Sequence, residues 1–221
     1  MNPNPNKPIT FRFGEYISEG YELYRKNFGK VLLATFFLFV LSIIPFCSFM
    51  AQGNMFKFLK KLKGGTPEAS EIFNFDDFAP YAKLFLILLA AILLLEIPLF
   101  VLIALGKDNP QEMPAYFPFY IIILVILLYI LIAKAFYITG LISLKGVKSV
   151  REAWRISSEM TKGNLLIIVG FLLIASLLAQ VGLIACVVGV FITYPIYYTS
   201  YFAAVDDGFK QKFNDQQLKN F

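Results

Sequence analysis

The feature that most constrains the fold is an apolar run of about 42 residues, 164–205, which contains no charged side chain. As one helix it would measure roughly 63 Å, at about 1.5 Å per residue. The hydrocarbon core of a bilayer is only about 30 Å thick. The run must therefore turn back on itself, and the segment from Gly182 to Gly189 is the favoured turn. We predict two transmembrane helices, residues 165–183 and 189–205.

Three more apolar segments are long enough to enter a bilayer, at about 20 residues per crossing. Residues 82–105 and 117–140 are predicted transmembrane helices, and the uncharged segment 31–52 is expected to bend at Pro45. The chain is 58% hydrophobic and only 16% charged, whereas a soluble domain has about 25% charged residues. The predicted fold class is all-α: a polytopic transmembrane helical bundle with interfacial amphipathic helices, in a single membrane domain over residues 1–221.

Charged and aromatic residues between these segments follow patterns typical of helices that lie on a membrane surface. Residues 9–30 have apolar side chains at spacings of three and four, which predicts an interfacial helix. Residues 53–81 are a predicted cytoplasmic interfacial segment. Residues 145–163 are a predicted cytoplasmic amphipathic helix with Ser149 as its N-terminal cap. The last residues, 206–221, are predicted to form a polar tail.

The distribution of lysine and arginine predicts the orientation, because basic loops stay in the cytoplasm. Loop 106–116 has one basic residue and the turn at 182–189 has none, so both are placed outside and the C-terminus is cytoplasmic. Both flanks of residues 31–52 are basic, which contradicts a single crossing. We favour a bent hairpin that enters the membrane and returns near Pro45. The alternative is one crossing that leaves the N-terminus outside.

Basic residues beside apolar segments indicate contact with anionic lipid rather than with nucleic acid. The net charge is +5, but no basic cluster is interleaved with aromatic residues on a soluble domain. Membrane lipids are therefore the expected partner, with a membrane protein or a second copy of the chain as further candidates. The predicted contacts with anionic lipid are Lys57, Lys60, Lys61, Lys63, Lys148, Arg151 and Arg155.

Two ionisable residues lie inside predicted spans, where charge is costly and indicates function. Glu96 is a candidate site for proton or cation coupling, and the alternative is a protonated side chain bonded to a neighbouring helix. Lys134 is either functional or extends to the cytoplasmic headgroups. Ala175, Ala179 and Gly182 recur at spacings of four and three, which predicts close helix packing.

The absence of histidine excludes Ser-His-Asp catalysis, histidine-ligated metals and histidine proton relays. The chain also lacks a Walker A motif and a dinucleotide-binding glycine motif. For the acidic stretch of Glu68, Glu71, Asp76 and Asp77, a solvated surface is favoured over a divalent-cation site. We therefore expect no enzymatic activity, no cofactor and no metal.

Two segments carry a resemblance to known proteins. The turn Lys63-Gly64-Gly65-Thr66-Pro67 is followed by Ile72-Phe73 and Asp76-Asp77-Phe78, and Glu152-Ala153-Trp154 leads to Lys162-Gly163-Asn164. This pattern resembles uncharacterised multi-pass bacterial membrane proteins and the membrane domain attached to some glycerophosphodiester phosphodiesterases. The resemblance implies a helical membrane fold in the bacterial cytoplasmic membrane. The chain lacks the acids and histidines that a phosphodiesterase catalytic domain would need.

These observations favour an integral membrane protein that is not an enzyme and that acts through lipid or through another membrane protein. The alternative is a small transporter or channel in which Glu96 couples transport to a proton or an ion.

Overall fold

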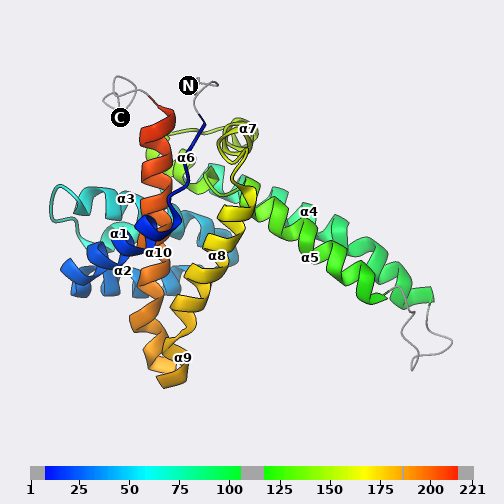
Figure 1. Cartoon of the computed structure of the whole chain (residues 1–221), viewed down its shortest axis with the longest axis horizontal. Coiled ribbons are helices and arrows are strands. Elements are labelled where there is room, and N and C mark those ends of the chain that lie inside the picture. Colours follow the sequence, from blue (N-terminus) through cyan, green and yellow to red (C-terminus); the bar gives the residue numbers. More distant parts are fainter. Residues whose placement is uncertain (1–7, 106–116, 186, 214–221) are drawn as a thin grey trace.

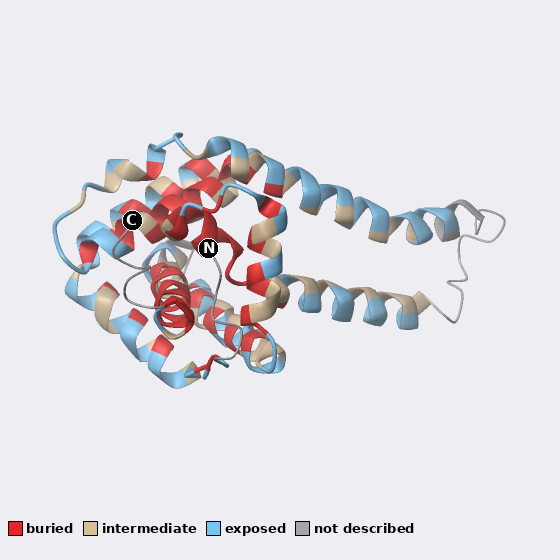
Figure 2. Ribbon diagram, turned by 90° about the horizontal axis from the view of Figure 1, so that it is seen from above, coloured by how far each residue is buried: buried red, intermediate tan, exposed pale blue. Residues whose placement is uncertain are grey.

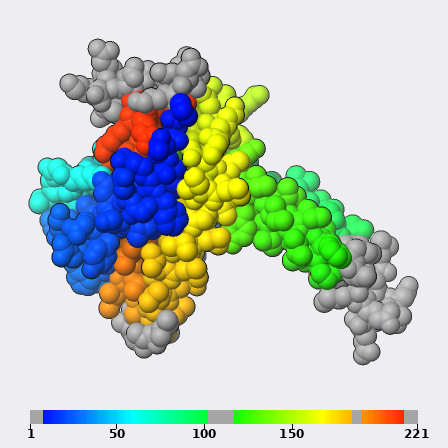
Figure 3. Space-filling view, viewed as in Figure 1, coloured from blue at the N-terminus to red at the C-terminus, as the bar shows by residue number. Residues whose placement is uncertain are grey.

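Helices are the only regular secondary structure in residues 8–105, 117–185 and 187–213, which are the residues that this computed structural model describes. Figure 1 shows a bundle packed around α10 and a long hairpin of α4 and α5 that projects from it, and the space-filling view shows the hairpin standing clear of the body (Figure 3). The α-helices are α1 (Phe13–Lys26), α2 (Phe28–Ser42), α3 (Ser48–Leu62), α4 (Phe78–Leu105), α5 (Phe117–Lys134), α6 (Ile138–Lys145), α7 (Val150–Met160), α8 (Leu165–Gln180), α9 (Gly182–Ala185) and α10 (Val187–Lys212).

Helix α10 is the centre of the bundle, because α1, α2, α3, α6 and α8 all pack against it. Its C-terminal half is buried from Tyr198 to Phe209. Helix α1 lies so close to α10 that a Cβ on Gly20 would be 2.4 Å from the backbone nitrogen of Ser200. Only glycine fits this contact without a shift of one helix.

The first apolar segment is broken at Pro45. Helix α2 ends at Ser42, Ile44 has the extended backbone expected before a proline, and a 3₁₀ turn (Pro45–Cys47) follows. Helix α3 then packs back against α2. With 15 residues, α2 is about 22 Å long, which is shorter than the apolar core of a bilayer.

Helices α4 and α5 expose apolar side chains along most of their length (Figure 2). The segments Phe78–Val101 and Phe117–Lys145 are both long and apolar enough to cross a membrane. In their most apolar stretches only 6% and 22% of residues are buried. An exposed apolar surface of this extent is typical of contact with lipid. The predicted loop 106–116 lies outside the described residues.

The C-terminal half contains a sharp corner followed by a second hairpin. At the N-terminus of α7, Ser149 Oγ accepts a hydrogen bond from the backbone N–H of Glu152 at 3.4 Å, as the sequence predicts. Helix α8 leaves α7 at an angle of 101°. It then packs beside α10, and the short helix α9 joins the two.

The prediction of four transmembrane helices is supported for two of them within the described residues. Residues 165–183 form α8, which ends at Gln180 and is only about 24 Å long. Helices α7 and α8 form a bent pair, and a third candidate span results only if this pair is counted as a single span. Residues 189–205 lie in α10, whose middle is rich in tyrosine, threonine and serine.

The prediction of a polar tail from residue 206 is wrong for its first part. Helix α10 continues to Lys212, and Asp206 and Asp207 are only 3% and 8% exposed. The helix continues because Phe209 is buried in the core and both acids have cationic partners. Residues 214–221 lie outside the described part of the chain.

The predicted surface segments also differ from the helices in the structure. Within 9–30 the helix α1 begins at Phe13, after residues without regular secondary structure, and a break at Asn27 separates it from α2. Residues 53–81 are divided between α3, a 3₁₀ helix (Ala69–Phe73) and the start of α4. The side chain of Asn54 explains this irregular path, because it donates hydrogen bonds to the carbonyl groups of Ile72 and Asn74.

Candidate functional site

A cavity of about 570 Å³ lies at the root of the α4–α5 hairpin, where the two helices join the bundle. We call it the root cavity. Its walls come from α3, α4, α5, α6, α8 and α10 and from the link between α5 and α6. The lining residues are Ser48, Phe49, Gln52, Leu84, Phe85, Leu88, Leu89, Ile92, Leu128, Leu131, Ile132, Ala135, Phe136, Ile138, Thr139, Leu172, Tyr197 and Tyr201.

The walls that α4 and α5 contribute are wholly apolar, whereas polar groups come from the bundle. Thr139 on α6 donates a hydrogen bond to Oε1 of Gln52 on α3 at 3.2 Å. The Tyr201 hydroxyl is already used, since it donates to the carbonyl of Phe136 at 2.5 Å. The cavity therefore has an apolar side towards the hairpin and a small polar floor in the bundle.

The turn between α5 and α6, at residues 135–137, lies beside this floor. Ser157 on α7 is fully buried, and its hydroxyl donates to the carbonyl of Lys134 at 2.6 Å. The same oxygen accepts the backbone N–H of Tyr137 at 3.1 Å. One serine thus satisfies two backbone groups, one at the end of α5 and one at the start of α6.

A second hollow, of about 990 Å³, lies beside α7, next to Pro8, Ile9 and Lys212, and is called the α7 groove. Two of the predicted lipid contacts, Arg151 and Arg155, line it together with Lys162. The hydroxyl of Ser158, also in the lining, is buried without a hydrogen-bond partner among the described residues. Lys148 instead lines a smaller hollow with Lys83 at the start of α4.

The four predicted lipid contacts on and after α3 are all paired with acids of the same chain. Lys57 lies 2.5 Å from Asp77, Lys61 lies 2.6 Å from Glu71, and both Lys60 and Lys63 contact Asp206. The acidic stretch is therefore partly neutralised within the protein. Sequence reasoning treated the lysines and the acids separately, because nothing in their spacing shows that α3 folds back over residues 71–77.

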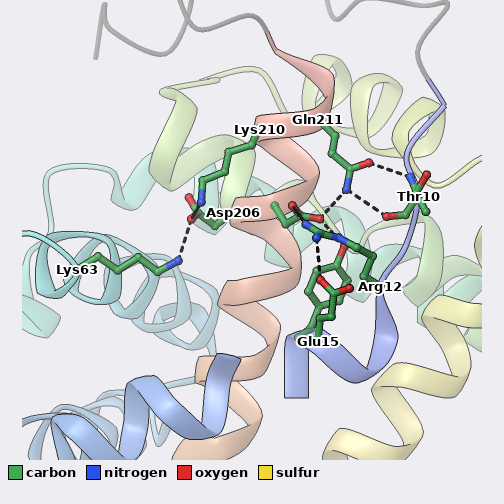
Figure 4. A network of polar contacts seen from close by, with 9 residues as sticks. Thr10, Arg12, Glu15, Lys63, Asp206, Lys210 and Gln211 are labelled. Atoms are coloured by element: carbon green, nitrogen blue, oxygen red, sulfur yellow. Dashed lines mark hydrogen bonds and ion pairs between the residues drawn. The ribbon is translucent and has the colours of Figure 1, made fainter. Parts of the chain in front are cut away.

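Asp206 and Asp207 form an ion cluster that sequence analysis missed, called the aspartate cluster (Figure 4). Asp206 lies 2.7 Å from Lys60, 3.0 Å from Lys63 and 3.0 Å from Lys210. Burial alone would raise the pKa of Asp206, but the hydrogen bond from Lys60 and the charges of the neighbouring lysines outweigh it and hold the pKa well below its ordinary value.

Asp207 joins the N-terminal segment to the same turn of α10. Arg12 lies 2.5 Å from one carboxylate oxygen, and the Tyr16 hydroxyl donates to the other at 2.6 Å. Gln211 also donates to Asp207 and exchanges hydrogen bonds with the backbone of Thr10 (Figure 4). Burial, and then the hydrogen bond to Asp207, raise the pKa of Tyr16. The cluster thus ties α1, α3 and α10 together, which is a structural role.

Glu96 and Lys134, the predicted intramembrane charges, are not brought together by an ion pair among the described residues. Glu96 is half-buried on α4 and does not line the root cavity. Beside it, the Tyr120 hydroxyl of α5 donates to the carbonyl of Leu95 at 2.7 Å, close to Pro98. Lys134 is the last residue of α5 and is half-buried near the bundle.

The small-residue stripe of α8 faces the bundle. Ala175 and Ala179 are fully buried. A Cβ on Gly182 would be 2.1 Å from the carbonyl oxygen of Gly189, so the two ends of the turn touch through their backbones. Within the described residues, no group of three or more acids or cysteines is arranged to hold a metal ion.

Neither a protein-family model, nor a curated protein, nor a solved structure matches this chain significantly.

Proposed function

We propose that this chain is a non-enzymatic membrane protein that binds a lipid-like molecule in the root cavity. The observation that carries the proposal is the cavity itself: about 570 Å³, lined mainly by leucine, isoleucine and phenylalanine, between two helices that expose apolar side chains. Binding sites for small apolar ligands have this size, with a few polar groups that orient the ligand.

We further propose that the chain crosses the membrane several times, with its C-terminus in the cytoplasm. Figure 1 supports this arrangement, because α9 and the far end of the α4–α5 hairpin extend away from α7 and from the C-terminal end of α10. Helix α7 would then lie along the cytoplasmic surface, since α8 leaves it at 101°. Arg151 and Arg155 of the α7 groove remain candidate contacts for anionic lipid.

The binding proposal is tested with a photoreactive alkyl chain, bearing a diazirine, added to the full chain in lipid nanodiscs. We expect saturable labelling of residues 84–92 and 128–139, mapped by mass spectrometry. Replacing Leu88 by Trp fills the cavity wall. Because the indole ring would occupy part of the volume that the alkyl chain needs, this change should lower the saturable labelling of the cavity.

The matched control is Leu93→Trp, which adds the same side chain to an exposed position of α4 outside the cavity. It should leave labelling of the root cavity unchanged. Labelling that cannot be saturated, or an equal decrease in both variants, would show that the chain only meets bulk lipid and would overturn the proposal.

A further inference from the structure

We propose that the ligand of the root cavity is a neutral amphiphile: an apolar chain whose uncharged head group accepts a hydrogen bond from Gln52. This inference rests on the proposed function of the cavity as a lipid site and specifies the chemical class of the lipid. It would exclude fatty carboxylates and phosphate-bearing head groups from this cavity.

The hydrogen bonds of the Gln52 side chain indicate that the ligand carries a hydrogen-bond acceptor. A glutamine side chain has one carbonyl oxygen and two N–H donors. The oxygen accepts from Thr139 at 3.2 Å, and the amide nitrogen has no hydrogen-bond partner among the described residues. Because Gln52 lines the cavity and is only half-buried, its N–H groups can donate to a bound carbonyl, ether or hydroxyl oxygen.

The position of the polar floor determines how the ligand is oriented in the cavity. Leu84 and Ile92, eight residues apart on α4, place the apolar wall along about 12 Å of helix leading away from the bundle. Thr139 and Gln52 belong to helices of the bundle. An amphiphile therefore fits with its head group on the floor and its chain between α4 and α5.

The lining also argues against a charged head group. None of the described residues that line the cavity is a lysine, an arginine or an acid. A carboxylate or phosphate buried there would lose its hydration without gaining a counter-ion, which is strongly unfavourable. Lys83 and Lys148 line a separate hollow, at the junction of α4 and α7.

The test compares three competitors of equal chain length, an alkane, a primary alcohol and a carboxylate, against the photoreactive alkyl probe bound to the full chain. We expect the alcohol to compete about three- to tenfold better than the alkane, which is the effect of one additional neutral hydrogen bond. The carboxylate should compete least. In Gln52→Leu the alcohol should fall to the level of the alkane, while labelling by the alkyl probe is retained.

Gln180→Leu is the matched control, because Gln180 is exposed on α8 and does not line the cavity. It should leave the preference for the alcohol intact. If Gln52→Leu does not fold, Thr139→Val removes the hydroxyl that orients Gln52 and should lower the same preference.

The possible outcomes separate the two proposals. Equal competition by alcohol and alkane, a preference for the carboxylate, or an alcohol preference that survives Gln52→Leu or Thr139→Val overturns the neutral-amphiphile inference, although the cavity would still bind lipid. If the protein without substitutions shows no saturable labelling, the lipid-binding function itself is overturned, and the inference with it.

Discussion

At Asp206, three lysine ammonium groups approach one buried carboxylate, from Lys60 in α3, from Lys63 just after it and from Lys210 in α10. The strength of this contact depends on the burial of the acid, because the lysines are themselves partly exposed and solvent screens them. An uncharged side chain of the same shape cannot form ion pairs with the three lysines. Position 206 therefore contributes to stability through charge rather than through volume.

Replacing Asp206 by Asn should destabilise the folded chain by about 2 kcal/mol, since several charge-assisted hydrogen bonds are lost and the lysines remain close together. Thermal unfolding of the purified protein in detergent measures the effect as a lower melting temperature. The control is Glu68→Gln, which neutralises an acid that is exposed. An equal change in both variants would mean that net charge, and not the cluster, sets stability.

The depressed pKa of Asp206 also predicts the response to acid. A carboxylate whose pKa is lower in the folded than in the unfolded chain stabilises the fold fully above its ordinary pKa of 3.8. That contribution is lost as the pH falls below this value. The melting temperature of the unchanged protein should therefore drop more steeply below about pH 4 than that of Asp206→Asn. If the melting temperatures of the two proteins fell in parallel with pH, Asp206 would not be the source of the acid sensitivity.

Among the helices, the junction of α5, α6 and α7 depends on adjacent serines with opposite roles. Ser157 Oγ bonds to two backbone groups, whereas Ser158 Oγ is buried without a partner among the described residues. Ser157→Ala should cost about 1–3 kcal/mol, because a buried N–H of Tyr137 loses its acceptor. Hydrogen exchange at residues 134–139 should increase. Ser158→Ala removes no bond and should leave exchange there unchanged, so a similar effect of both changes would contradict the assigned roles.

The sequence indicates the helices better than it indicates their ends and partners. Apolar length predicts α4 and α5, and Pro45 predicts the break between α2 and α3, because both depend on local physical rules. The continuation of α10 beyond residue 205 was not predictable, because its acids are stabilised by Lys60, Lys63 and Arg12, which are distant in sequence. The root cavity was missed for the same reason, since six helices contribute to it.

For the whole molecule, the proposed orientation predicts opposite accessibility of two surfaces. In a variant without native cysteines, Asn109→Cys in the predicted outer loop should react with a membrane-impermeant thiol reagent added outside oriented vesicles. Lys148→Cys, which is exposed just before α7, should react only after the vesicles are opened. Reaction of both cysteines from the same side would contradict the proposed topology.

The α4–α5 hairpin is attached to the protein at one end, and its buried residues, such as Tyr81, Leu84 and Ala133, lie near that end. Because the described part of the hairpin is anchored only at this end, a change in its tilt would move α4 and α5 where they form walls of the root cavity. The width of the cavity would then depend on the mechanical state of the bilayer. Occupancy of the cavity and membrane tension would be coupled through the same pair of helices.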